Sequence, residues 1–253
     1  MEVALDDEQA FLATYDASRY PRPSVAVDVV LLTVADDTLK TLLVRRTSQP
    51  QQGLWALPGT FLGLDESPDE AAARALAAKA GIDNVFTEQL YTFGAPGRDP
   101  RTRVLSIAHY ALVEPSRLTE LAGAACNRDL MLASLVVDAN GHVRSVQARA
   151  NGGSPLLLAF DHADILAAAV ERIRGKLDYA PIGFELLPAT FTLLALRRVH
   201  EAILGRPLNK DSFRRTVLDR GLVEATGTYS TGLGHRPPEL YRFAAGDTAR
   251  RRR

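Results

Sequence analysis

Residues 57–82 read LPGTFLGLDESPDEAAARALAAKAGI, and they hold the clearest local structural signal in the chain. The run Ser67-Pro68-Asp69-Glu70 is the pattern of a capping box with proline at the first helical position. Alanine, the best helix former, dominates the residues that follow, and Gly81 is the residue type expected just past a helix end. The stretch therefore predicts a helix that begins after Ser67 and ends near Ala80.

The same stretch resembles the signature of the Nudix hydrolases. That signature runs Gly, five free positions, Glu, seven free positions, then Arg-Glu-apolar-x-Glu-Glu-x-Gly-apolar. The matching positions are Glu66, Arg74, Leu76, Gly81 and Ile82. The departures are Thr60 at the opening Gly, and Ala75, Ala78 and Lys79 at the three helical glutamates. In the family those glutamates hold the magnesium ions and the catalytic water, so the resemblance implies a Nudix scaffold that has lost most of its chemistry.

The physical consequence of these substitutions concerns metal binding. A divalent metal site for phosphate chemistry needs hard oxygen ligands, usually carboxylates. Ala75 and Ala78 offer methyl groups, and Lys79 puts an ammonium where a cation should sit. Helix propensity alone would also explain the two alanines, but the matches around them favour a degenerate box. Because only Glu66 remains, we expect no metal, no catalytic residue and no required cofactor, and a domain that binds a nucleotide without cleaving it.

Bulk composition narrows the class of protein. The length of 253 residues fits two domains. No apolar run is long enough to span a bilayer, and the acidic N-terminus lacks a signal-peptide pattern. The single cysteine, Cys126, fits a reducing compartment. These features predict a soluble, cytoplasmic protein with no membrane partner.

The net charge of zero conceals an asymmetry. Residues 181–253 carry 13 basic and 7 acidic side chains, which leaves +6 there and −6 in the remainder. Such asymmetry suggests that the C-terminal part meets a polyanion. The alternative is a solvated basic surface together with an Arg-rich tail, residues 246–253, which we expect to be disordered.

Residues 21–180, after an N-terminal segment of residues 1–20, have an α/β pattern. Apolar, β-branched runs predict strands over 24–34, 39–45, 85–93, 104–113 and 155–160. A hairpin is expected over 134–147 across Asn140-Gly141. Asp161 is a candidate N-cap for a helix over 162–176. The two predicted helices and their strands indicate a Nudix-like α/β/α sandwich.

Residues 181–245 have a different pattern. Thr192 opens a predicted helix that ends near Leu204, and Asn209 caps a second one over 210–220. Candidate strands over 222–225 and 238–243 follow, with a glycine-containing segment between them. Helix, short turn, helix and hairpin is the layout of a winged helix-turn-helix domain.

The second of these helices is the predicted recognition helix, with Phe213, Val217 and Leu218 on its inner face. Arginine and lysine can contact phosphates or guanine edges, and serine and threonine serve either. The candidate DNA-binding residues on this helix and the wing are Lys210, Ser212, Arg214, Arg215, Thr228, Tyr229, His235 and Arg236. The alternative is a helical subdomain that makes protein contacts, but the basic charge favours DNA.

The other candidate site is the pocket of the Nudix-like domain. Its candidate ligand-binding residues are Arg45, Arg46, Trp55, Glu66, Arg98, Asp99 and Arg101. Arginine suits bidentate phosphate contacts, and an aromatic ring can stack on a base. The alternatives are an ordinary solvated turn at Asp99-Pro100 and core packing for Trp55.

Nearly the whole chain resembles the NrtR family, the Nudix-related transcriptional regulators of bacterial NAD biosynthesis. The similar segments are YDASRYPRPSVAVDVVLL, RRTSQPQQGLWALPGTF, RDPRTRVLSIAHYAL, AFDHADILAAAVERIRGKLDYAPIGFELLP and RPPELYRF. The resemblance implies a homodimeric repressor that senses ADP-ribose and binds a palindromic operator in double-stranded DNA, in front of NAD biosynthesis or salvage genes.

Two other functions remain open from the residues. Some family members retain hydrolase activity, so one alternative is an active pyrophosphatase acting on ADP-ribose or a related nucleotide. A third possibility is a Nudix-like sensor whose output is protein binding. Nudix-related regulators also include sugar sensors, so ADP-ribose follows from the family and not from individual residues.

Overall fold

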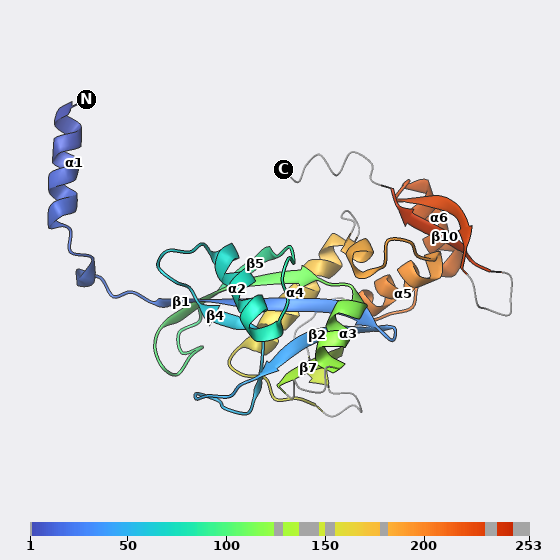
Figure 1. Ribbon diagram of the computed structural model, residues 1–253, viewed down its shortest axis with the longest axis horizontal. Helices are drawn as coiled ribbons and strands as arrows, with labels where there is room; N and C mark the ends of the chain where they lie inside the picture. The colour runs from blue at the N-terminus through green and yellow to red at the C-terminus, as the bar shows by residue number, and fades with distance from the viewer. Residues whose placement is uncertain are drawn as a thin grey trace.

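The computed structural model describes residues 2–123, 129–136, 147–149, 155–177, 182–230 and 237–244. A mixed sheet with the strand order β5-β6-β1-β2-β7-β8 forms its centre (Figure 1). These strands are β1 (Ser24–Ala35), β2 (Thr38–Arg45), β5 (Glu88–Phe93), β6 (Val104–Leu112), β7 (Leu130–Val136) and β8 (Gln147–Arg149). β1 and β6 run parallel, and the other neighbours run antiparallel. The short strands β3 (Trp55–Ala56) and β4 (Gly59–Phe61) pair with β2 and β1.

Helices cover both faces of this sheet. Residues of β1 alternate between the two faces, as the period of a strand requires. Val27, Val29 and Leu31 pack in the cluster beneath α2 (Pro68–Ala80) and α3 (Pro115–Gly123). Val30, Leu32 and Val34 pack in the cluster with α4 (His162–Lys176). The predicted α/β/α sandwich is confirmed.

The helix that the capping box predicts is present as α2. The Ser67 hydroxyl accepts from the Glu70 amide, and the Glu70 carboxylate accepts from the Ser67 amide at 2.7 Å. The helix ends at Gly81, which takes the left-handed conformation with φ 67°. A side chain at this φ is strained, so glycine suits the position.

Several expectations for the sandwich need correction. The strand expected over 85–93 begins only at Glu88, and 155–160 forms an isolated bridge between Leu158 and Trp55 in place of a strand. Asp161 makes no side-chain cap to α4, and its two oxygens accept from Arg98 instead. Helices α3 and α1 (Glu2–Thr14) were not expected. Residues 137–146 of the predicted hairpin, Cys126 and the tail at 246–253 lie outside the described residues.

The C-terminal elements form the predicted winged helix layout. They are the 3₁₀ turn η2 (Ile182–Leu186), α5 (Leu193–Leu204), α6 (Lys210–Asp219), β9 (Val223–Tyr229) and β10 (Glu239–Phe243). Thr192 caps α5 by accepting from the Ala195 amide, and Asn209 caps α6 by accepting from the amides of Asp211 and Ser212. Phe213, Val217 and Leu218 were predicted to form the inner face of α6. The prediction is wrong for Leu218, because this residue is 37% exposed.

Helix α5 contributes side chains to the cores of both parts of the chain. Val199 and Ile203 of α5 belong to the sandwich core with Ile173 of α4, whereas Leu196 belongs to the winged helix core. Arg198 of α5 also pairs with Asp37 in the β1–β2 turn at 3.1 Å. The segment just after the proposed boundary at 180 therefore contributes to both cores, and the winged helix is anchored on the sandwich.

Helix α1 and the winged helix lie at opposite ends of the molecule (Figure 1). On α1 the apolar residues Phe11 and Leu12 are each about 60% exposed. The short 3₁₀ turn η1 (Ala17–Arg19), capped by Asp16, connects α1 toward the sheet. None of the described helices combines the length and the apolar character that a membrane crossing requires.

Candidate functional site

The surviving glutamate of the degenerate box is fully engaged by its own neighbours. Nε of Arg74 donates to Oε2 of Glu66 at 3.0 Å, and Nη2 donates to Oε1 at 2.5 Å. The amide of Gly63 donates to the same Oε1 at 2.6 Å. The hydrogen bond from Arg74, followed by that from Gly63, lowers the pKa of Glu66. This carboxylate therefore ties the loop before α2 to the helix and is not directed at a ligand.

The residues at the positions of the three helical glutamates of the signature do not fit magnesium. On α2, Ala75 faces the core and is buried, whereas Ala78 and Lys79 are exposed. Over the described ranges, His, Cys, Asp and Glu form no group of three or more that could hold a metal ion. Magnesium needs oxygen ligands, and an ammonium at Lys79 repels it.

A cavity of about 340 Å³ opens beside α2 and β4. The predicted residues that line it are Arg46, Arg98, Asp99 and Arg101, and Lys79 of the box joins them. Arg45, Trp55 and Glu66 are not among its lining residues. Arg45 is exposed, and Trp55 packs against the sandwich core. The structure thus brings together four of the seven residues predicted for ligand binding.

Two arginines of the loop before β6 line the cavity, Arg98 and Arg101, and both pair with acidic side chains. Arg98 donates from Nε and Nη2 to the two oxygens of Asp161 at 2.7 and 2.6 Å, and its side chain is only 5% exposed. Arg101 makes a two-point pair with Asp99, and these hydrogen bonds hold the pKa of Asp99 below its usual range. Arg98 therefore organises the cavity floor from a buried position, whereas the Arg101 side chain is 43% exposed.

Two aromatic rings at the cavity were missed by the sequence reasoning. The guanidinium carbon of Arg46 lies 4.7 Å from the ring centroid of Phe160. That of Arg101 lies 5.2 Å from the Phe61 centroid and 6.0 Å from the Phe160 centroid. Burial, and then the charge of Arg101, lower the pKa of Arg46. The cavity therefore offers flat apolar surfaces beside cations, a combination that suits a nucleotide.

Phe160 has an unusual backbone. Its φ is 51°, a left-handed value that is costly for a bulky side chain. The side-chain oxygen of Gln51 accepts from the Phe160 amide at 2.7 Å and helps to hold the strained conformation. Such outliers concentrate at binding sites. No feature of the sequence around Phe160 signals this conformation.

A cluster of three buried polar side chains, Asp28, Ser106 and His162, lies at the base of the cavity. The Ser106 hydroxyl donates to Oδ2 of Asp28 at 2.6 Å, and Nε2 of His162 lies 3.6 Å from Oδ1 of Asp28. Nδ1 of His162 accepts from the Leu57 amide at 2.8 Å. Burial lowers the pKa of His162, so the ring stays neutral. A Cβ on Gly59 would lie 2.2 Å from Oδ1 of Asp28, which explains the glycine there.

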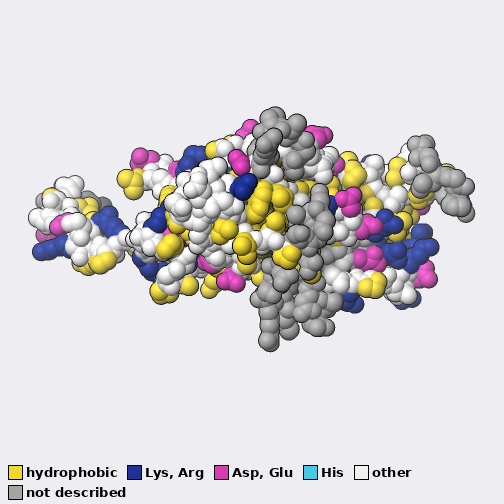
Figure 2. Space-filling model, turned by 90° about the horizontal axis from the view of Figure 1, so that it is seen from below, with side chains coloured by type: hydrophobic (Ala, Val, Ile, Leu, Met, Phe, Trp, Pro, Cys, Tyr) yellow, Lys and Arg dark blue, Asp and Glu magenta, His cyan; other side chains and the backbone are white. Residues whose placement is uncertain are grey.

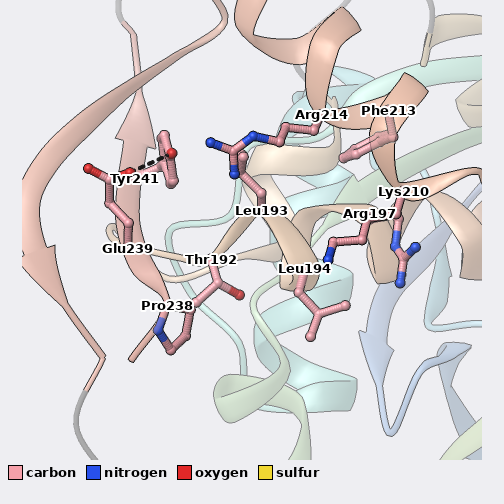
Figure 3. Close-up of a pocket in the computed structure, with 10 residues that line it drawn as sticks. All are labelled: Thr192, Leu193, Leu194, Arg197, Lys210, Phe213, Arg214, Pro238, Glu239 and Tyr241. Atoms are coloured by element: carbon pink, nitrogen blue, oxygen red, sulfur yellow. Dashed lines mark hydrogen bonds between the residues drawn. The ribbon is translucent and has the colours of Figure 1, made fainter. Parts of the chain in front are cut away.

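The predicted DNA-binding residues on α6 point in different directions. Phe213 and Val217 face the core, so Arg215, two residues from each, faces nearly the opposite way. Lys210 and Arg214 line a cavity of about 390 Å³ between α5, α6 and β10 (Figure 3). Ser212 lies on the other flank of α6, in a hollow that His200 also lines.

The wall that β10 contributes to the cavity between α5 and α6 contains one pair of polar side chains, Glu239 and Tyr241. The Tyr241 hydroxyl donates to Glu239 at 2.7 Å, and this hydrogen bond raises the pKa of Tyr241 (Figure 3). Arg214 points toward this pair (Figure 3). On β9 the predicted wing residues Thr228 and Tyr229 are exposed. His235 and Arg236, also predicted for the wing, lie outside the described residues.

Basic side chains gather at the end of the molecule that carries the winged helix, interspersed with acidic ones (Figure 2). Within the described part of this domain, Arg242 pairs with Glu224 at 2.9 Å and Arg197 approaches Glu201 at 3.7 Å. No ion pair is formed by the exposed Arg215 with another described residue. Its charge is available to a polyanion.

Comparison with known proteins agrees with this two-part organisation. The NrtR DNA-binding winged helix domain matches residues 183–243, and the NUDIX domain matches residues 22–125. The chain is 35% identical over 249 residues to the "ADPR responsive transcriptional repressor NtrR" of Acinetobacter baylyi, covering 98% of this chain and 92% of that protein.

Solved structures show the same arrangement. The NrtR of Shewanella oneidensis, crystallised with a 27mer DNA, is 31% identical with a TM-score of 0.68, covering 87% of this chain and 93% of that one. A MutT/nudix family protein from Enterococcus faecalis, 24% identical with a TM-score of 0.74, covers 95% of this chain and 93% of that one and shares the fold. The relatedness over nearly the full length, together with both matching domains, shows that the chain belongs to the NrtR family of Nudix-related transcriptional regulators.

Proposed function

We propose that the protein is a DNA-binding transcriptional repressor whose Nudix domain senses ADP-ribose without hydrolysing it. The observation that carries this proposal is the pairing of two features in one chain. A cation-lined Nudix cavity lacks the helical glutamates of the Nudix box, and a winged helix is anchored on the same core. The Acinetobacter relative, an "ADPR responsive" repressor over nearly the full length of the chain, supports the same function.

The chemistry of the cavity supports binding without hydrolysis. Phe61 and Phe160 supply surfaces on which a nucleobase can stack, and Arg46 and Arg101 supply charges for phosphate oxygens. Hydrolysis of a diphosphate by a Nudix enzyme requires carboxylate-held magnesium, and the only box carboxylate left, Glu66, is occupied by Arg74.

On the DNA side, the proposed partner is a palindromic operator read by a homodimer. A two-fold protein places one recognition helix in each half-site, so the half-site spacing reports the dimer geometry. In this proposal α6 enters the major groove, and the wing strands β9 and β10 approach the backbone. The family resemblance points to operators in front of NAD biosynthesis or salvage genes.

The test is a mobility shift on DNA upstream of NAD-synthesis genes, with and without ADP-ribose. The expected result is a specific complex that ADP-ribose weakens, with no complex on a scrambled fragment of equal length. In parallel, ADP-ribose and magnesium are incubated with the protein, and no AMP above the buffer background is expected. Release of AMP that Glu66→Gln abolishes contradicts the proposal and favours an active pyrophosphatase.

A further inference from the structure

Lys79 stands on α2 at the edge of the ligand cavity, at the position where the Nudix signature has its last helical glutamate. Its side chain is exposed, and over the described residues its ammonium takes part in no hydrogen bond or ion pair. A lysine on a solvent-exposed helix face usually does not line a cavity, whereas Lys79 does. Lys79 therefore brings an uncommitted positive charge to a position where the Nudix signature has a metal-holding glutamate.

The other charges of the cavity make this one significant. Arg98 is neutralised by Asp161 and lies 3.6 Å from Asp28. Arg101 is neutralised by Asp99. Arg46 makes no ion pair with a described residue: its Nε donates to the carbonyl oxygen of Pro50, and its guanidinium lies over a ring. The lining therefore has two cations that form no ion pair with a described residue, Arg46 and Lys79.

A diphosphate diester carries one negative charge on each phosphate group. Two uncommitted cations match that charge without a metal, and neither has to break an existing ion pair to bind. Magnesium serves the same purpose in a hydrolase, but it also activates water. A lysine ammonium neutralises phosphate oxygens without lowering the pKa of a bound water.

We propose that Lys79 replaces the metal ion of the Nudix box, so that this protein binds the diphosphate of its nucleotide effector through Lys79 and Arg46 without magnesium. This inference rests on the proposed function, because it concerns the same effector and cavity. The Nudix signature has a glutamate at position 79, and Lys79 carries the opposite charge. Loss of hydrolysis requires only that the carboxylate be absent, whereas binding of a diphosphate also explains the positive charge.

The experiment is calorimetry of ADP-ribose binding to the full chain, in EDTA and in magnesium. Wild type is expected to bind equally well in both. Lys79→Ala is expected to lose roughly tenfold to hundredfold in affinity, the range for a hydrogen bond to a charged group. Lys79→Glu is expected to bind still more weakly in EDTA, because its carboxylate repels the diphosphate.

Ala77→Glu is the matched control. Ala77 is exposed on the same helix but does not line the cavity. The control therefore adds the same negative charge nearby, and it is expected to retain most of the wild-type affinity. An equal loss in Ala77→Glu and Lys79→Glu would indicate a general effect of helix charge and overturn the inference.

Two further outcomes separate this inference from the proposed function. Wild-type binding that requires magnesium, or a Lys79→Ala variant that binds like wild type, overturns the role of Lys79 and leaves ADP-ribose sensing in place. Absence of ADP-ribose binding by wild type under both conditions overturns the effector assignment, and the role of Lys79 falls with it. Melting temperatures of the variants establish that each one is folded.

Discussion

Arg174, in the last turn of α4, donates from Nε to the carbonyl oxygen of Ile203, in the last turn of α5, at 2.8 Å. Its Nη2 also donates to the carbonyl oxygen of Leu204 at 2.6 Å. The last carbonyl groups of a helix lack partners within the helix, so these bonds attach the end of α5 to α4. Because α4 begins at His162 in the cavity of the Nudix domain, one helix connects this cavity with the end of α5.

This connection predicts that Arg174→Ala uncouples the two sites. A ligand shifts DNA affinity only by the difference in its own affinity for the two states, and the effect is reciprocal. In wild type we expect ADP-ribose to weaken operator binding by a coupling free energy of about 1–3 kcal/mol. In Arg174→Ala that coupling should fall toward zero while each ligand alone still binds. Fluorescence anisotropy of labelled operator, with and without ADP-ribose, measures it.

Arg172→Ala is the control for this prediction. Arg172 lies on the same helix and has the same charge, but it donates to the carbonyl oxygen of Leu90 within the sandwich. It should keep the wild-type coupling. Unchanged coupling in Arg174→Ala shows that the signal does not travel through the α4–α5 contact.

A second prediction concerns Phe160 as a stacking surface. Phe160→Gly removes the ring and places glycine at a φ that glycine adopts without strain, so the melting temperature should stay close to that of wild type. Loss of base stacking should weaken ADP-ribose binding by about 1–3 kcal/mol. Calorimetry checks this, with Phe11→Ala on α1 as the exposed-aromatic control. Full affinity in Phe160→Gly contradicts a role for the ring in binding.

The sequence predicts best those features that depend on neighbouring residues. The capping box at Ser67 and the caps at Thr192 and Asn209 act within three residues, so the helices they begin could be predicted. Asp161 has the residue type of an N-cap, but Arg98, 63 residues away in the chain, takes its carboxylate. A local pattern carries no information about such a competitor.

The candidate site depends on long-range packing to a greater extent. Asp28 and Ser106 form a buried pair across 78 residues, and the Leu57 amide meets His162 across 105. Trp55 was expected to stack on a base, and it packs against the core because β3 pairs with β2 beside it. Clustered arginines on one loop indicated a phosphate site, but their division into paired and unpaired charges required the structure.

A third prediction concerns pH. Burial lowers the pKa of His162 in the folded protein, whereas in the unfolded chain it lies near 6.5. The unfolded state therefore binds more protons below that value, and stability is lost as the pH falls through about 6.5. The loss from this group is at most about 1.4 kcal/mol per pH unit.

His162→Asn isolates this contribution. Asparagine offers an oxygen for the Leu57 amide but does not titrate in this range. Thermal unfolding between about pH 7.5 and about pH 5.5 should show a smaller decline in melting temperature for the variant than for wild type. Parallel declines in the two proteins contradict the assignment of a neutral, buried His162.

The last prediction separates the two adjacent arginines of α6. Arg215 points away from the domain core, whereas Arg214 lines the cavity beside Tyr241 and Glu239. Arg215→Ala should weaken operator binding by about 1–3 kcal/mol if it reads a base. If it contacts a phosphate, the slope of log affinity against log salt should fall by about one. Arg214→Ala should cost less because its guanidinium faces the wing. Arg172→Ala, whose side chain bonds within the sandwich, controls for the loss of one charge. Titration of labelled operator at several salt concentrations measures all three variants. If Arg215→Ala binds the operator as tightly as Arg172→Ala does, α6 is not the recognition helix, and the DNA contacts must come from another surface of the winged helix.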